Sequence, residues 1–140
     1  MKTPEECFKI ANEYFENAKE ILNEIEVKND RYSNIKKVQK ACGLMWLAVL
    51  SAIDGYLMKR GVKYENLPKT TDAYWGILKK YLVHNGKIID AFDTVWDVIH
   101  SYGYYNGGND ARIIKIGVKE AKFIIEKLSI KDKNKGGDND

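Results

Sequence analysis

Hydrophobic residues fill the stretch from 41 to 58, and a single carboxylate, Asp54, interrupts it. The stretch has the length of a helix but no polar stripe, and a helix that is apolar on all sides is normally enclosed by other helices. Gly61 suits a helix stop, because glycine readily takes the left-handed conformation that ends many helices. The pattern therefore predicts a central buried helix over about residues 33–60.

The N-terminal segment shows a helix start followed by regular apolar spacing. Thr3 and Glu6 have the spacing of a capping box, and Pro4 occupies the first helical position. Apolar residues then recur at alternating steps of three and four, which places them on one face of a helix packed at a shallow angle. The residues of this face are Phe8, Ala11, Phe15, Ala18, Leu22 and Ile25.

Three shorter helical patterns follow the central one. The first begins at Thr71 or Asp72, and the second carries apolar residues at bundle spacing over 88–102. The segment 103–108 is predicted to be a loop, because three glycines in six positions make a helix unfavourable. The last helical pattern begins after this loop and ends near residue 128.

Short connections between these segments favour antiparallel neighbours. The sequence therefore predicts an all-α protein, an up-and-down antiparallel bundle of four to five helices that forms a single domain over 1–130. The segment 131–140 has no large apolar residue, and its lysines and aspartates balance in charge. Because such a segment has nothing to bury, we predict a disordered polar tail.

Charge and composition narrow the classes of function. The chain has 140 residues with 23 basic and 20 acidic side chains, and a net charge of +3 is too small for a nucleic-acid footprint unless the basic residues cluster on one face. The N-terminus lacks the apolar run of a signal peptide, and the stretch 41–58 falls short of a bilayer span. We therefore predict a cytoplasmic protein, and we expect neither a membrane, nor nucleic acid, nor a cofactor as its partner.

The two cysteines, Cys7 and Cys42, both fall in apolar helical patterns. We interpret them as small buried hydrophobic residues in a reducing compartment, with a disulfide or a metal pair as the alternative. A structural zinc site needs four ligands, and the two cysteines and two histidines of this chain are not suitably spaced for one.

Asp54 is the most informative single residue, because a carboxylate on an apolar helix needs a partner to offset its desolvation. The predicted partners include His100 and the hydroxyl groups of Tyr102, Tyr104 and Tyr105, which lie around the glycine-rich segment. One interpretation is a core carboxylate that fixes the helix register, a second is a ligand anchor in a pocket lined by tyrosine and tryptophan, and a third is a side chain that is simply exposed. These five residues are our candidate ligand-binding set.

Acidic residues on the fourth helical pattern raise the question of a metal site. Asp97 and His100 have the carboxylate-x-x-His spacing of di-iron bundles, but those sites need a second such pair and two further glutamates. A solvated acidic face is the alternative interpretation of Asp90, Asp93 and Asp97. We retain Asp97 and His100 as a weak metal candidate and predict no catalytic residue, because no nucleophile–base arrangement is recognisable.

The long apolar helix over 41–61, preceded by an amphipathic helix, resembles the HEPN-type helical bundle. Active HEPN ribonucleases carry an arginine four to six residues before a histidine on a late helix. In this chain Arg31, Arg60 and Arg112 precede no suitably spaced histidine, and no arginine precedes His100 at that spacing. The resemblance therefore implies the bundle fold but not the ribonuclease activity.

The chain also resembles a family of small bacterial helical proteins of unknown function. This likeness implies the helical fold and the importance of the central carboxylate and of the Gly-Tyr-Tyr segment, and it implies no reaction. The residues that carry it are Ala48-x3-Ala52-x-Asp54 and His100-x-x-Gly103-Tyr104-Tyr105-x-Gly107.

Taken together, these patterns predict a helical binding or protein-interaction module without catalysis. The first alternative is a HEPN-like protein with one of two roles. It is either associated with RNA or acts as the partner protein in a toxin–antitoxin or nucleotidyltransferase pair. The second alternative is a bundle that binds a small ligand or a metal. Tyr74 and Trp75, on the short third helix, could support a homodimer through their apolar surface.

Overall fold

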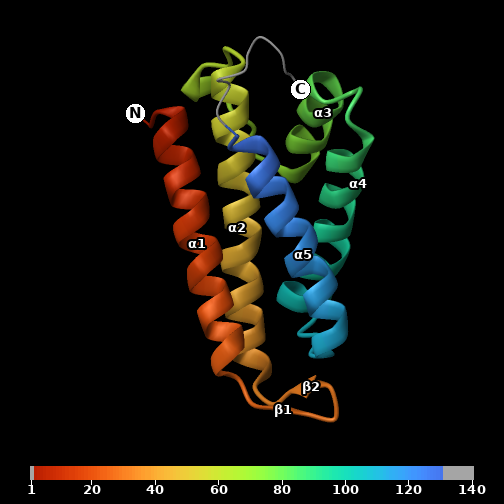
Figure 1. Cartoon of the computed structure of the whole chain (residues 1–140). Helices are drawn as coiled ribbons and strands as arrows, with labels where there is room; N and C mark the ends of the chain where they lie inside the picture. The colour runs from red at the N-terminus through yellow and green to blue at the C-terminus, as the bar shows by residue number, and fades with distance from the viewer. Residues whose placement is uncertain (1, 131–140) are drawn as a thin grey trace.

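The computed structural model describes residues 2–130, which form a bundle of antiparallel helices (Figure 1). This arrangement confirms the predicted all-α fold. The predicted tail over 131–140 lies outside the described residues. The elements in chain order are α1 (Pro4–Glu24), β1 (Val27–Lys28), β2 (Arg31–Tyr32), α2 (Ile35–Lys59), the 3₁₀ helix η1 (Tyr64–Asn66), α3 (Thr71–Tyr81), α4 (Gly86–Thr94), the π-helix η2 (Val95–Tyr105) and α5 (Ala111–Leu128).

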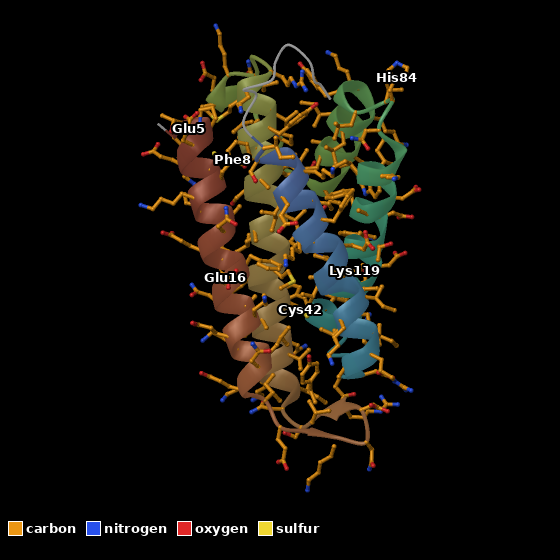
Figure 2. All side chains as sticks on the ribbon, in the orientation of Figure 1. Glu5, Phe8, Glu16, Cys42, His84 and Lys119 are labelled. Carbon is orange, nitrogen blue, oxygen red and sulfur yellow. The ribbon has the colours of Figure 1, made fainter. Side chains whose placement is uncertain are left out.

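The start of α1 has the predicted capping box. The backbone N–H of Glu6 donates to Thr3 Oγ1 over 3.1 Å, and the backbone N–H of Thr3 donates to Glu6 Oε1 over 2.8 Å. The apolar face of α1 packs along α2, while Glu16 points away from the bundle and Cys42 lies inside it (Figure 2). Both cysteines are free and buried, and burial raises the pKa of Cys42 to about 12.

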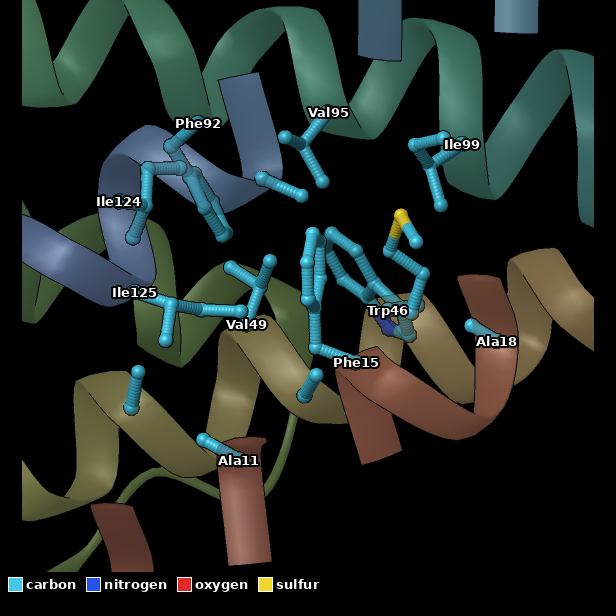
Figure 3. Packing of buried hydrophobic residues seen from close by; sticks show 14 of the residues in the cluster. Ala11, Phe15, Ala18, Trp46, Val49, Phe92, Val95, Ile99, Ile124 and Ile125 are labelled. Carbon is cyan, nitrogen blue, oxygen red and sulfur yellow. The ribbon is translucent and has the colours of Figure 1, made fainter. Parts of the chain in front are cut away.

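Helix α2 carries more of the core than any other element, and its bounds agree with the predicted 33–60. This helix is long and apolar enough to cross a membrane, by length and composition alone. The buried core helix of a helical bundle meets the same two criteria. Side chains of α1, α2, α4 and α5 meet around it in one core (Figure 3). Its enclosure is incomplete, however, because Leu47 is 44% exposed and its neighbours Leu44 and Leu50 are half-buried.

The loop predicted over 103–108 is wrong in its first half, because the helix continues as the π-helix η2 to Tyr105. The backbone N–H of Asn106 donates to the carbonyl of Ser101, a bond that spans five residues as in a π-turn. Gly103 is a packing residue here: a Cβ atom at this position would lie 2.5 Å from Cys42 Sγ on α2. The glycine therefore permits close approach of two helices rather than ending one of them.

A short hairpin between α1 and α2 was not predicted. Strands β1 and β2 pair antiparallel, with Val27 opposite Tyr32 and Lys28 opposite Arg31. The two turn residues, Asn29 and Asp30, have φ values of 52° and 64°. Asparagine and aspartate tolerate this left-handed region better than other residues with side chains, so the pair that interrupts the helical pattern builds a tight turn.

The hairpin holds the beginning of α5 (Figure 1). The backbone N–H of Ala111 donates to the carbonyl of Asp30 over 2.7 Å, and the N–H of Tyr32 donates to the carbonyl of Asn109 over 2.8 Å. Arg112 adds an ion pair to Asp30 at 3.8 Å. The hairpin thus fixes the end of the bundle at which α5 starts.

Candidate functional site

The structure does not bring the five candidate ligand-binding residues together. Asp54 lies in the second half of α2, whereas Gly43, in the first half of that helix, faces the ring of Tyr104. Eleven residues of α-helix separate these two positions, or about 16 Å along the axis. Asp54 and the Tyr104 region are therefore two separate places on the bundle, and the predicted contact between them is wrong.

The partner of Asp54 is a residue that the sequence did not indicate. The hydroxyl of Tyr74, on α3, donates to Asp54 Oδ1 over 2.8 Å. Burial raises the pKa of Asp54 to about 6, and the Tyr74 hydroxyl, Lys2 and Lys69 each oppose this rise. The structure thus favours the interpretation of Asp54 as a hydrogen-bonded carboxylate that joins α3 to α2.

This environment predicts a pH-dependent stability. Because the pKa of Asp54 is higher in the folded chain, the unfolded chain loses this proton first, and the folded state loses stability as the pH rises from about 4 to about 6. After allowance for partial exposure, we expect the free energy of unfolding to fall by about 1–2 kcal/mol over this range. Urea unfolding at several pH values, at a protein concentration low enough for the chain to be monomeric, measures this change.

The variant Asp54→Asn keeps an oxygen that accepts from Tyr74 but has no charge to desolvate. We expect it to be more stable than the wild type at neutral pH and to show no gain at about pH 4, the ordinary range of an aspartate. Glu16→Gln removes an exposed carboxylate from α1 and is the matched control. Equal pH dependence in Asp54→Asn and the wild type would show that Asp54 is not the responsible group.

Tyr102 and Tyr105 have different surroundings. The hydroxyl of Tyr102 accepts from the backbone N–H of Asp110 over 3.0 Å, and its ring occupies the space beside Gly108 where a Cβ atom would clash. Asp110 caps α5, and its hydrogen bonds with Arg112 lower its pKa to about 2. Tyr102 therefore supports the turn into α5, while Tyr105 is 75% exposed.

The side chains of Trp96, His100 and Tyr104 form a row along η2. The rings of Trp96 and His100 stack with centroids 4.2 Å apart and planes 11° apart, and His100 is 5.7 Å from Tyr104. Trp46 of α2 lies against this row, 5.6 Å from Trp96 and 5.0 Å from His100. Successive members of the row are four residues apart, a spacing that places side chains on one side of a helix.

His100 is held by these rings rather than by hydrogen bonds. Its Nδ1 atom is buried and has no hydrogen-bond partner among residues 2–130. Desolvation lowers the pKa of the imidazole below its ordinary value, so His100 is mainly neutral at physiological pH. The side chain therefore presents a flat, uncharged ring beside Tyr104.

A groove of about 410 Å³ runs between the first half of α2 and η2. Gln39 Nε2 donates to the Tyr104 carbonyl over 3.2 Å and so ties the two helices together at one end of the groove. The groove includes two of the predicted residues, His100 and Tyr104. The sequence did not indicate the apolar residues of this lining, because the whole apolar stretch of α2 is typical of a buried helix. The lining residues are Gln39, Lys40, Gly43, Leu44, Trp46, Leu47, His100 and Tyr104.

The π-helix also bears on the metal candidate. In an α-helix Asp97 and His100 would lie close on one face, but the wider π-turn separates residues three apart. Asp97 is exposed, whereas His100 is half-buried against Trp96. Within residues 2–130, no group of three histidine, cysteine or acidic side chains is placed to hold a metal ion.

Comparison with known proteins agrees with this description of a helical bundle. A solved structure titled protein of unknown function, from Dyadobacter fermentans, is 29% identical and aligns over 91% of this chain and 97% of that chain, with a TM-score of 0.77. The search of curated proteins found no match.

The family match covers nearly the whole bundle. Residues 6–130 match the family described as domain of unknown function DUF5618, and the chain belongs to that family. The predicted membership of a family of unknown function is therefore confirmed.

Proposed function

We propose that this protein is a protein-interaction module whose binding surface is the open side of α2. The observation that carries the proposal is the exposure of large apolar side chains on the core helix itself. Leu47 is 44% exposed and lies between the half-buried Leu44 and Leu50, and we call these three residues the α2 flank. Contiguous exposed apolar surface on a soluble domain typically marks an interaction site.

The groove beside η2 extends the α2 flank with aromatic side chains. Trp46, His100 and Tyr104 line it, and Tyr104 is 46% exposed. Aromatic residues held rigidly by their neighbours lose little entropy on binding, and they are enriched among the residues that contribute most to interface affinity. Flank and groove together therefore have the chemistry of a protein-binding surface.

Site-specific photo-crosslinking tests this proposal. A benzophenone side chain in place of Leu47 is expected to form covalent adducts with a protein partner in the native cells. The same group in place of Glu16, on the exposed side of α1, is the matched control. The proposal fails if position 47 gives no adduct beyond the level of position 16.

A second candidate function follows from the HEPN-like pattern, namely a role as an RNA-associated protein. It is supported by the placement of Lys40 and His100 along one groove, which puts a cation beside an imidazole. An RNA-cleavage assay with His100→Ala as control tests it. Cleavage that the substitution abolishes would favour this candidate, and no cleavage by the wild type would remove a nuclease role.

A further inference from the structure

We infer that the occupant of the α2 flank is a second copy of this chain, bound antiparallel around a two-fold axis that passes beside Leu47. This inference rests on the proposed function and names its partner. In such an arrangement, a residue that precedes Leu47 in one copy faces a residue that follows Leu47 in the other copy. The two residues are equally far from Leu47 along the sequence. The sequence of the flank can therefore be checked for self-complementarity.

The two-fold rotation brings residues of compatible chemistry together along the exposed stripe of α2, which includes the α2 flank with Lys40 and Asp54. Leu44 faces Leu50 of the second copy, so apolar side chains meet on both sides of the axis. Seven residues from the axis on either side, Lys40 faces Asp54, so opposite charges meet at both ends. Residues seven apart return to nearly the same side of an α-helix, which places Lys40, Leu47 and Asp54 in one line.

The charges of this stripe are unpaired within one copy. Among residues 2–130 the ion pairs are those of Arg112 with Asp30 and Asp110, so neither Lys40 nor Asp54 takes part in one. Asp54 accepts a hydrogen bond from Tyr74 but keeps a desolvated carboxylate. Lys2 and Lys69 lower the pKa of this carboxylate without forming an ion pair with it, so an ammonium group from a second copy would make the direct ion pair that is missing within one copy.

Helix α3 and the groove lie at opposite ends of this face of α2. Tyr74 places α3 over the end of the stripe that carries Asp54, and Trp75 packs on Phe92 with centroids 4.8 Å apart. The other end of the same face carries the open groove with Trp46 and His100. The two-fold rotation brings α3 of each copy to the groove of the other.

The size of the surface requires both kinds of contact. From Lys36 to Met58 the stripe is about 33 Å long, and a strip about 10 Å wide then offers roughly 330 Å². A specific interface of standard size buries about 800 Å² on each partner. The helix stripe alone is too small, and the two contacts between α3 and the groove would have to supply the remainder.

The mass of the purified protein in solution tests the inference. Light scattering and sedimentation over a wide range of concentration should show a species of twice 16.1 kDa. Leu47→Glu should give a folded monomer, as judged by an unchanged helical circular-dichroism spectrum and a cooperative melting curve that does not depend on protein concentration. Ile116→Glu changes a side chain on α5 that is 54% exposed and should leave the dimer intact. A wild type that stays monomeric, or a Leu47→Glu protein that stays dimeric, overturns the inference.

Disulfide trapping tests the antiparallel register independently of mass. Leu47→Cys should link two copies rapidly, because its Cβ atoms lie across the axis, whereas Ile116→Cys should not. In a mixture of Leu44→Cys and Leu50→Cys proteins, the mixed disulfide should predominate over either self-linked species. Predominance of a self-linked species would refute the register.

The crosslinking and mass measurements together distinguish failure of the homodimer from failure of the interaction module. Adducts from position 47 to another protein, together with a monomeric purified chain, would contradict the homodimer and leave the interaction module in place. No adduct at all, together with a monomer, would contradict both.

Discussion

Replacing Phe92 by alanine is expected to lower the free energy of unfolding by about 3–5 kcal/mol. The side chain is 0% exposed, and its ring stacks on Trp46 with centroids 5.6 Å apart and contacts the edge of Trp75. The substitution would remove the aromatic centre that joins α2, α3 and α4. Urea unfolding monitored by circular dichroism measures the loss.

The same substitution at a less buried position serves as the control. Phe123, on α5, is half-buried, so Phe123→Ala removes the same atoms but less buried surface. We expect it to cost about 1–2 kcal/mol, in proportion to the smaller area removed from water. Equal losses at the two positions would show that Phe92 is not the centre of the core.

Gly103→Ala is expected to destabilise the protein by about 1–3 kcal/mol, although alanine is the better helix former. The added Cβ would lie 2.5 Å from Cys42 Sγ and 3.1 Å from Ile114 Cδ1. Because both neighbours belong to packed helices, η2 would have to move away from α2. The melting temperature and the free energy of unfolding report this overpacking.

A double-mutant cycle identifies the clash as the cause. Cys42→Ala removes the sulfur atom, so the cost of Gly103→Ala should be smaller in that background than in the wild type. A Cβ atom added to Gly76 on α3 would meet nothing within 4 Å, so Gly76→Ala should be neutral or stabilising by up to about 1 kcal/mol. Additive costs for positions 42 and 103 would argue against contact between them.

Local signals predicted the helix boundaries well. The capping box at Thr3 satisfies backbone N–H groups within a few residues, and such a pattern is visible in sequence. The Gly103 segment was misjudged because glycine has two uses. It ends helices by its conformational freedom, and it also permits close helix contact through its lack of a side chain, which depends on distant residues.

The candidate site was less predictable, because its residues meet only through tertiary packing. Tyr74 reaches Asp54 from α3, and the placement of that helix depends on the burial of Trp75 against Phe92. The exposure of Leu47 could not be predicted from the sequence either, because leucine occurs both in buried cores and at interaction surfaces. Exposure in the folded bundle is the distinguishing signal.

The hairpin that holds the first turn of α5 has a consequence for how the chain is made. Residues 27–32 leave the ribosome long before the residues they bind, Asn109 and Ala111, have been synthesised. Loop closure over such a separation is slow compared with the pairing of adjacent helices. The nascent chain therefore passes through a stage in which α1 and α2 have emerged but α5 has not yet covered their apolar side chains. A chaperone that binds the chain at this stage would protect these side chains.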